Sequence, residues 1–243
     1  NIIIFFPSYE RGGAEKILLN IIKHLPKKNF SVYLITNADK KKLGINGIKI
    51  LKIPDYNIPL LNNRIVTGFI AIKYLICLLL KLNKIDTRIL SMQSNFFSVL
   101  ISKIFNFKVF VRVSEDPCGA TYYADNRLLA LLILISKFIT YNFSNGIITN
   151  GNKSKLCVQS IVYNKKKVRL LFNPYLSRLR LIKNQKKEKY FLHIGRLCKQ
   201  KNQKCLIEAF NYFKKNNKEF KLIIIGDGPD KSHLISQVNK LNL

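Results

Sequence analysis

The sequence predicts an α/β protein built on a mainly parallel, doubly wound sheet. Two observations carry this prediction: short apolar runs bounded by turn residues recur along the chain, and helical stretches separate most of them. Buried strands joined by helices form parallel sheets. The chain has 243 residues and 48% hydrophobic content, enough for one large or two ordinary domains with buried cores.

The elements of the first part follow one another in that alternation. The predicted strands are Ile2–Phe6, Ser31–Thr36, Ile48–Ile53, Thr87–Ser91, Lys108–Val113, Gly146–Thr149 and Val168–Phe172. The predicted helices are Ala14–Leu25, Ile65–Leu82, Asn95–Phe105, Arg127–Phe143 and Lys153–Tyr163.

A second βα pattern follows the charged stretch "YLSRLRLIKNQKKEK", which we interpret as an interdomain connection. We expect domains at residues 1–182 and 183–243. The second holds strand Tyr190–Ile194, helix Asn202–Lys215, strand Lys221–Ile225 and a helix from Asp230. Because two strands and two helices bury too little apolar surface to close a core, we expect this domain to be truncated. We also expect the chain to lack its true N-terminus, since Asn1 opens inside a strand signal without Met.

The charge balance favours anionic partners. Lys and Arg outnumber Asp and Glu by 42 to 13, giving a formal net charge of +29. Such a field attracts nucleic acid, anionic lipid headgroups or phosphorylated small molecules, and does not choose among them. Two helices are apolar nearly all round, Ile65–Leu82 and the stretch Leu128–Ile139. Because Lys73 interrupts the first, we expect a buried helix or one at a membrane surface rather than a span.

The cysteines show neither a CxxC pair nor metal-ligand spacing with histidine, so no metal site is expected. We interpret them as reduced thiols of a cytosolic protein. They are Cys77, Cys118, Cys157, Cys198 and Cys205.

Three glycine-containing turns carry the chemical signal. Gly12-Gly13 joins a strand to a helix, where a ligand can approach the backbone and the unpaired helix-start N–H groups suit a phosphate or a sugar oxygen. In "HIGRLCKQKNQKCLIEAF" a strand ends at Gly195, and Arg196, Lys199 and Lys201 precede a helix. Those cations could clamp a diphosphate and stabilise the charge that develops as it leaves. The third turn is "IIGDGP", which alone fits any tight βα turn.

Together, in this order, the three stretches resemble the family 4 glycosyltransferases of the GT-B fold. The likeness covers essentially the whole chain: "GGAE", "GRL…QKN…LI.AF", "IIGDGP" and the Asn173-Pro174 pair in "VRLLFNPY". The resemblance implies two Rossmann-like doubly wound domains, the second incomplete. It also implies transfer of a sugar from a nucleotide diphosphate donor to an acceptor hydroxyl, with retention and without a required metal or other cofactor.

The resemblance also assigns residues. Arg196 and Lys201 match the family's contacts to the donor diphosphate and are the expected catalytic residues. Donor or acceptor binding across the interdomain cleft is expected of Gly12, Gly13, Glu115, Asp116, Gly195, Asn202, Gly226 and Gly228. The family's paired glutamates, seven residues apart, have no counterpart after Gly228. We therefore expect this polypeptide alone to lack part of its donor site and to be inactive.

The charge and apolar helices suggest an acceptor at an anionic membrane, such as a bacterial lipid-linked glycan, lipopolysaccharide or other cell-surface polysaccharide. The expected location is cytoplasmic, peripheral on the inner face of the cytoplasmic membrane. A basic nucleic-acid-binding protein is the alternative from another class. Dispersed lysines, the lack of Trp and the lack of an RRM, KH or helix-turn-helix signature argue against it, so no nucleic-acid partner is expected.

Two alternatives share parts of the fold. A GT-B relative such as a nucleotide-sugar epimerase would share the architecture without the "GRL…QKN" loop. A nicotinamide-dependent Rossmann enzyme does not fit, because Gly12-Gly13 lacks the G-x-G-x-x-G spacing and no acidic residue ends the second strand.

Overall fold

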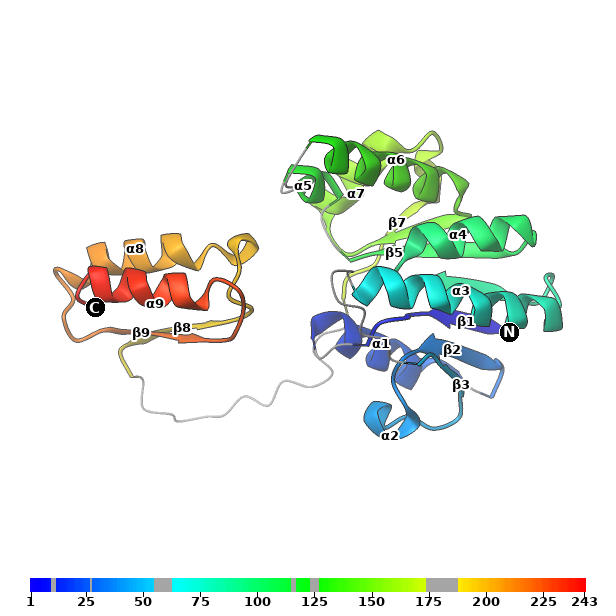
Figure 1. The fold of residues 1–243 in the computed structure, drawn as a ribbon, viewed down its shortest axis with the longest axis horizontal. Coiled ribbons are helices and arrows are strands. Elements are labelled where there is room, and N and C mark those ends of the chain that lie inside the picture. The colour runs from blue at the N-terminus through cyan, green and yellow to red at the C-terminus, as the bar shows by residue number, and fades with distance from the viewer. Residues whose placement is uncertain (10–11, 27, 55–62, 115–116, 123–126, 174–187) are drawn as a thin grey trace. The chain divides into compact units, whose positions relative to one another are not determined.

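The parallel sheet of the N-terminal unit confirms the predicted α/β class (Figure 1). The computed structural model describes every residue except 10–11, 27, 55–62, 115–116, 123–126 and 174–187. The chain divides into two units, Asn1–Arg178 and Leu179–Leu243. The boundary predicted between residues 182 and 183 lies outside the described residues.

Seven parallel strands form the sheet of the N-terminal unit, in the order β3-β2-β1-β4-β5-β6-β7. The strands are β1 Ile2–Phe5, β2 Val32–Thr36, β3 Lys49–Lys52, β4 Arg88–Ser91, β5 Lys108–Val113, β6 Gly146–Thr149 and β7 Val168–Leu170. The strand order reverses beside β1, whose neighbours are β2 and β4. Open α/β sheets bind ligands beyond the carboxyl ends of the strands at such a switch point.

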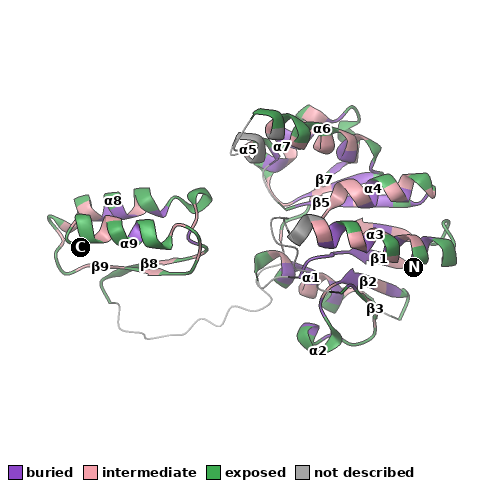
Figure 2. Ribbon diagram, in the orientation of Figure 1, coloured by how far each residue is buried: buried purple, intermediate pink, exposed green. Residues whose placement is uncertain are grey.

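Helices cover both faces of this sheet. They are α1 Gly13–His24, α2 Lys40–Leu43, α3 Asn63–Lys81, α4 Asn95–Ile104, α5 Pro117–Tyr122, α6 Arg127–Phe143 and α7 Asn152–Ile161, and a 3₁₀ turn covers Lys165–Lys167. Successive strand residues point to opposite faces, so Ile3 and Ile4 enter different cores. Ile4 packs in the core that contains Leu18 of α1, and Ile3 packs in the core that contains Leu75 of α3. Figure 2 shows buried residues along the strands and their facing helix sides.

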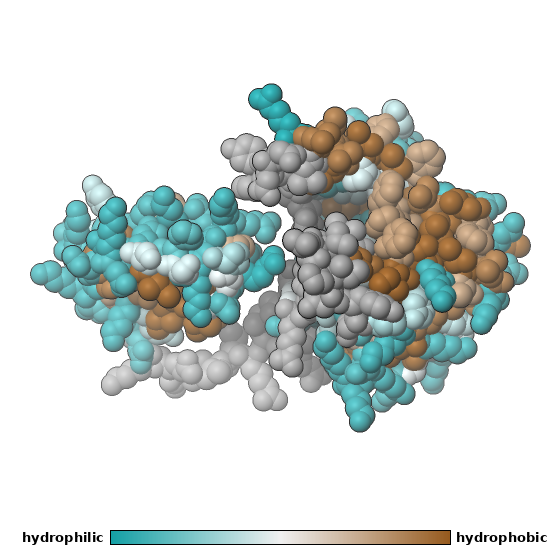
Figure 3. Space-filling model, viewed as in Figure 1, coloured by the Kyte–Doolittle hydropathy of each residue, from teal (hydrophilic) through white to brown (hydrophobic). Residues whose placement is uncertain are grey.

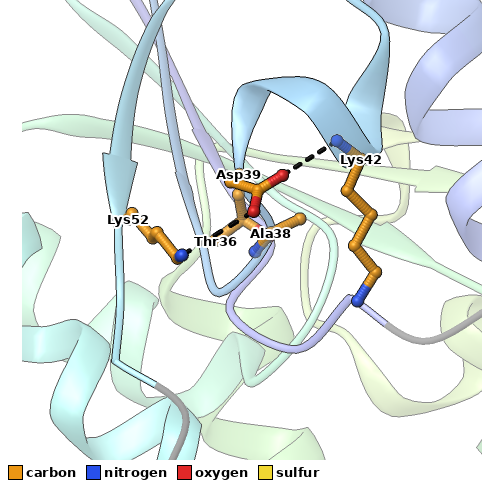
Figure 4. Close-up of polar contacts among 5 residues, drawn as sticks. All are labelled: Thr36, Ala38, Asp39, Lys42 and Lys52. Atoms are coloured by element: carbon orange, nitrogen blue, oxygen red, sulfur yellow. Dashed lines mark hydrogen bonds and ion pairs between the residues drawn. The ribbon is translucent and has the colours of Figure 1, made fainter.

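The short helix α2 was not predicted, and Asp39 caps it (Figure 4). The Asp39 carboxylate accepts a hydrogen bond from the Lys42 backbone N–H at 2.8 Å and lies 3.8 Å from Lys52 Nζ on β3. The bond from the Lys42 N–H is the main cause that lowers the Asp39 pKa, and the charge of Lys52 acts in the same direction. Gly44 ends the helix in the left-handed region, with φ 60°.

The prediction of five reduced thiols is wrong for one pair. Cys118 of α5 and Cys157 of α7 form a disulfide, with their Cα atoms 6.2 Å apart. The two helices lie side by side, although 39 residues separate the cysteines in the sequence. Spacing along the chain therefore gave no signal for this pair. Cys77, Cys198 and Cys205 are free.

The C-terminal unit is a two-stranded parallel sheet with helices on one face. Its elements are β8 Tyr190–Ile194, a 3₁₀ turn at Lys199–Lys201, α8 Gln203–Lys214, β9 Lys221–Ile225 and α9 Lys231–Lys240. Leu222 and Ile224 face the core that Leu197, Ile207 and Leu234 form. The side chains that point to the opposite face of the sheet are exposed. They include Leu192, Ile194, Ile223 and Ile225.

Candidate functional site

Two strand-to-helix loops meet at the carboxyl edge of the β8–β9 sheet. The first loop begins at Gly195 after β8, and the second begins at Gly226 after β9. The backbones bond directly: the Gly195 N–H donates to Ile225 O at 3.0 Å, and the Leu197 N–H donates to Asp227 O at 2.9 Å. Six of the predicted site residues therefore lie on one edge: Gly195, Arg196, Lys201, Asn202, Gly226 and Gly228.

The second loop's glycines leave room for the first loop. A Cβ at Gly226 would lie against the Gly195 carbonyl oxygen and 3.0 Å from the carbonyl carbon. A Cβ at Gly228 would lie 2.9 Å from the Leu197 backbone N, and its φ of 157° is one that side chains rarely adopt. Both glycines thus have a packing role that the sequence did not predict.

The first loop presents three cations to solvent at this edge. Arg196, Lys199 and Lys201 are exposed. In the described part of the chain, no hydrogen bond or ion pair occupies the side chains of Arg196 and Lys201. Asp227 of the second loop is an acidic neighbour; its carboxylate accepts from the Gly228 N–H at 3.0 Å and pairs with Lys231 at 3.5 Å. Arg196 and Lys201 therefore remain available to a bound anion.

Asn202 turns the chain from the 3₁₀ turn into α8. Its φ of 50° and ψ of 41° lie in the left-handed region, which Asn tolerates better than most side chains. The helix begins at Gln203, so its first N–H groups lie next to Lys201. The positive helix end and the cations together make this edge suited to a phosphate group.

Gln203 is a residue that the sequence analysis missed. Its side chain is 2% exposed, and its Nε2 donates to the Arg196 carbonyl at 2.7 Å. The same nitrogen lies 3.2 Å from His193 Nε2, at the end of β8. Gln203 thereby fixes the Arg196 backbone to the first turn of α8. An amide in the first turn of a helix is ordinarily exposed, so no pattern predicted this role.

In the N-terminal unit, Gly12 and Gly13 lie at the start of α1, beyond the carboxyl edge of β1. Gly12 is the residue before the helix, with an extended φ of −176°, and Gly13 is the first helical residue. A Cβ at Gly13 would meet nothing within 4 Å. The space beside Gly13 is therefore open to a ligand, and the fold itself does not require the glycine.

Polar groups lie along the same edge of the large sheet. Arg112 of β5 is buried, and its guanidinium donates to Asn173 Oδ1, which belongs to the Asn-Pro pair named above. Asn95 Nδ2 donates to the Arg112 carbonyl at 3.4 Å. Glu115 and Asp116, which follow β5 and were predicted to contact sugar hydroxyls, lie outside the described residues.

The described residues contain neither a membrane-spanning helix nor a cluster of metal ligands. None of the helices there is both long and apolar enough to cross a bilayer. No group of three or more His, Cys, Asp or Glu side chains in the described ranges could hold a metal ion.

Comparison with known proteins identifies a matching family model and solved structures of the same fold. Residues 180–243 match the family model of the glycosyl transferases group 1. Anabaena HepE, solved in complex with UDP and glucose, superposes with a TM-score of 0.69 at 14% identity, over 99% of this chain and 66% of HepE. The fold is that of the GT-B glycosyltransferases. A second GT-B structure, the lipopolysaccharide outer core galactosyltransferase WaaB, gives a TM-score of 0.62 at 17% identity, over 99% of this chain and 65% of WaaB.

Two curated relatives of this chain are named as glycosyltransferases. One is the N-acetylgalactosamine-N,N'-diacetylbacillosaminyl-diphospho-undecaprenol 4-alpha-N-acetylgalactosaminyltransferase of Campylobacter jejuni, 29% identical over 251 residues. The match covers 99% of this chain and 66% of the relative. An uncharacterized glycosyltransferase of Methanocaldococcus jannaschii is 31% identical, over 60% of this chain and 39% of its own length.

Proposed function

We propose that the protein is a glycosyltransferase of bacterial glycan synthesis. It transfers a hexose-type sugar from a nucleotide diphosphate donor to a hydroxyl of a lipid-linked glycan, with retention of anomeric configuration. Within the GT-B superfamily we assign it to family 4. We place it at the cytoplasmic face of the membrane, and we expect the reaction to need no metal ion.

The observation that carries the proposal is the pair of unoccupied cations at the carboxyl edge of β8–β9. Arg196 and Lys201 both precede the first turn of α8, and the Gln203 amide holds the Arg196 backbone in place. This edge lies inside the segment that matches the group 1 family model. UDP in the HepE structure supports a nucleotide diphosphate as the ligand.

The proposed role of the two cations is to stabilise the leaving diphosphate. Negative charge grows on the diphosphate oxygens as the bond to the sugar breaks, so a cation held at this position lowers the barrier more than it strengthens ground-state binding. Loss of one such group costs about 3 kcal/mol, or roughly a hundredfold in rate.

The acceptor proposal rests on two lines of support. The Campylobacter relative is named for a diphospho-undecaprenol glycan acceptor, and the strongly positive chain favours an anionic lipid surface. The open space at Gly13, at the start of α1, is the proposed place where the acceptor sugar approaches the backbone.

The test is a transfer assay with the purified full-length protein, because we expect the polypeptide of residues 1–243 alone to be inactive. UDP-N-acetylgalactosamine is the first donor to try, with an undecaprenyl-diphosphate-linked sugar as acceptor and EDTA present in a parallel reaction. We expect an α-linked product by NMR from an α-linked donor, at the same rate with and without EDTA. An inverted product would contradict retention, and loss of rate in EDTA would contradict metal independence.

A binding control distinguishes the proposed glycosyltransferase from the alternative, a nucleic-acid-binding protein. Single-stranded DNA is titrated against the chain under the same salt conditions as the nucleotide sugar. Tight DNA binding without nucleotide-sugar binding would favour a nucleic-acid-binding protein and overturn the proposal.

A further inference from the structure

The outer sides of α3, α4 and α6 expose large apolar residues. On α6, Leu128 is 68% exposed, Leu132 55% and Ile135 46%. Phe69 and Leu80 of α3 and Ile104 of α4 are exposed to a similar degree. Because α4 contacts both α3 and α6, these residues belong to neighbouring helices, and Figure 3 shows hydrophobic side chains gathered over this side of the unit. We call this surface the apolar face.

The rest of the unit holds α6 in this orientation. Tyr141 and Thr140, near its C-terminal end, are buried. Lys167 Nζ donates to the Asn142 carbonyl at 2.7 Å and to the Ser144 carbonyl at 3.1 Å, where the negative end of the helix dipole favours a cation. The exposed leucines therefore sit on a helix that is anchored at its C-terminal end.

The charged residues on the three helices of the apolar face are all basic. The sequences of α3, α4 and α6 contain no Asp or Glu. Lys73 and Lys81 of α3 and Arg127 of α6 are exposed. Lys73 lines a groove of about 490 Å³ together with the apolar residues Phe69, Ile72 and Ile76.

This charge pattern favours an anionic bilayer over a second copy of the chain as the partner of the apolar face. A second copy docked on the face would bring these cations against the same cations, with no carboxylate on the three helices to pair with them. An anionic bilayer instead presents a headgroup layer to the cations and an acyl boundary to the leucines. Large apolar residues exposed on three neighbouring helices indicate an interaction site.

We propose that the apolar face is the surface by which the protein inserts into an anionic membrane. Leu128, Leu132 and Ile135 enter the boundary between headgroups and acyl chains, while Lys73, Lys81 and Arg127 contact the headgroups. Helices of a parallel α/β unit begin at the carboxyl edge of the sheet. The N-terminal end of α6, which carries Leu128, therefore lies toward the edge that carries Gly13. The relevance of that edge to a lipid-linked acceptor rests on the function proposed above.

The lack of Trp in the chain gives a direct test. Leu132→Trp places a single indole on the apolar face, and Ile235→Trp places one at a matched position, 52% exposed, on α9 of the other unit. Vesicles of phosphatidylethanolamine with about one third phosphatidylglycerol are added to each full chain. We expect a blue shift and quenching by brominated acyl chains for Leu132→Trp alone.

A partition measurement tests the same surface without a reporter. The triple variant Leu128→Ser, Leu132→Ser, Ile135→Ser should sediment with these vesicles at least about tenfold more weakly than the wild type. Lys73→Glu with Lys81→Glu should also weaken sedimentation and reduce its salt dependence. Tyr212→Ser with Ile235→Ser, exposed apolar positions in the C-terminal unit, is the matched control and should sediment like the wild type.

Three outcomes would overturn the proposal: equal sedimentation of the triple variant and the wild type, no spectral change for Leu132→Trp, or a dimer by light scattering that the triple variant abolishes. The variants are checked by circular dichroism, so a folding defect is detected separately. No donor or acceptor is present in these assays. Failure of sugar transfer therefore leaves the membrane result intact, and failure of membrane binding leaves the transfer assay intact.

Discussion

The Gly195 carbonyl lies directly against Gly226, at the position where any other residue would carry its Cβ. The Gly195 N–H also donates to Ile225 O at 3.0 Å, so the two βα loops of the C-terminal unit contact each other through their backbones. This contact fixes the start of the loop that carries Arg196. The proposed diphosphate site thus depends on a glycine in the neighbouring loop.

Gly226→Ala should therefore destabilise the C-terminal unit. The added methyl group would meet the Gly195 backbone, which cannot move away as a flexible side chain can, and we expect a loss of about 2 kcal/mol or more in the free energy of unfolding. Urea denaturation followed by circular dichroism measures the loss. Gly13→Ala is the matched control, because a Cβ there meets nothing within 4 Å. An equal stability of Gly226→Ala and wild type would contradict the loop contact.

Gln203→Ala should weaken the same loop by another route. The variant removes the side-chain donor of the Arg196 carbonyl, a part-buried bond, and leaves a cavity at a residue that is 2% exposed, at a cost of about 1–3 kcal/mol. Gln237→Ala removes two exposed bonds, from Gln237 Nε2 to the Lys204 carbonyl and to Glu208 Oε1, each at 3.2 Å, and should cost about 0.5 kcal/mol or less because water replaces both. Urea midpoints of the two variants make the comparison, and equal losses would show that Gln203 does not hold the loop.

Acid should remove the capping contribution of Asp39. Its pKa is lowered in the folded protein, chiefly by the hydrogen bond from the Lys42 N–H, so ionised Asp39 stabilises the fold above its ordinary pKa of 3.8. That contribution is lost as the pH falls through the lowered value. Unfolding of wild type and Asp39→Asn at about pH 7 and about pH 3 should differ more at the higher pH. A difference that grows on acidification would have the wrong sign.

Alkylation should distinguish two classes of cysteine. Cys118 and Cys157 are bonded, so iodoacetamide under denaturing, non-reducing conditions should label only Cys77, Cys198 and Cys205. Prior reduction should raise the label count to all five cysteines. Intact-protein mass spectrometry counts the labels. Five labels without reductant would restore the prediction of reduced thiols.

The long elements were predictable from sequence because each buries a continuous face. The strands and the helices α1, α3, α4 and α6 lie within about two residues of their predicted bounds. The helices α2 and α5 were missed, because four and six residues are too few to show a helical period. The truncation of the second domain stays a prediction.

The candidate site was predictable in position but not in its internal contacts. Glycines and cations that follow a strand indicate a sheet edge, so Gly195, Arg196 and Lys201 could be named from sequence. The roles of Gly226 and Gly228 in loop packing, and the buried amide of Gln203, depend on which loops meet in space. Sequence spacing carries no information about that meeting, as the Cys118–Cys157 pair also shows.

Binding of UDP to the chain tests the central claim most directly. In a ¹⁵N-labelled sample, UDP should shift the backbone amides of Gly195, Arg196, Lys201 and Gln203. Arg196→Ala and Lys201→Ala should each weaken binding about tenfold or more, because each removes a cation from the diphosphate. Lys215→Ala, just beyond the far end of α8, should bind like the wild type. Wild-type affinity in both cation variants, or shifts confined to residues outside this edge, would contradict the assignment of the donor site.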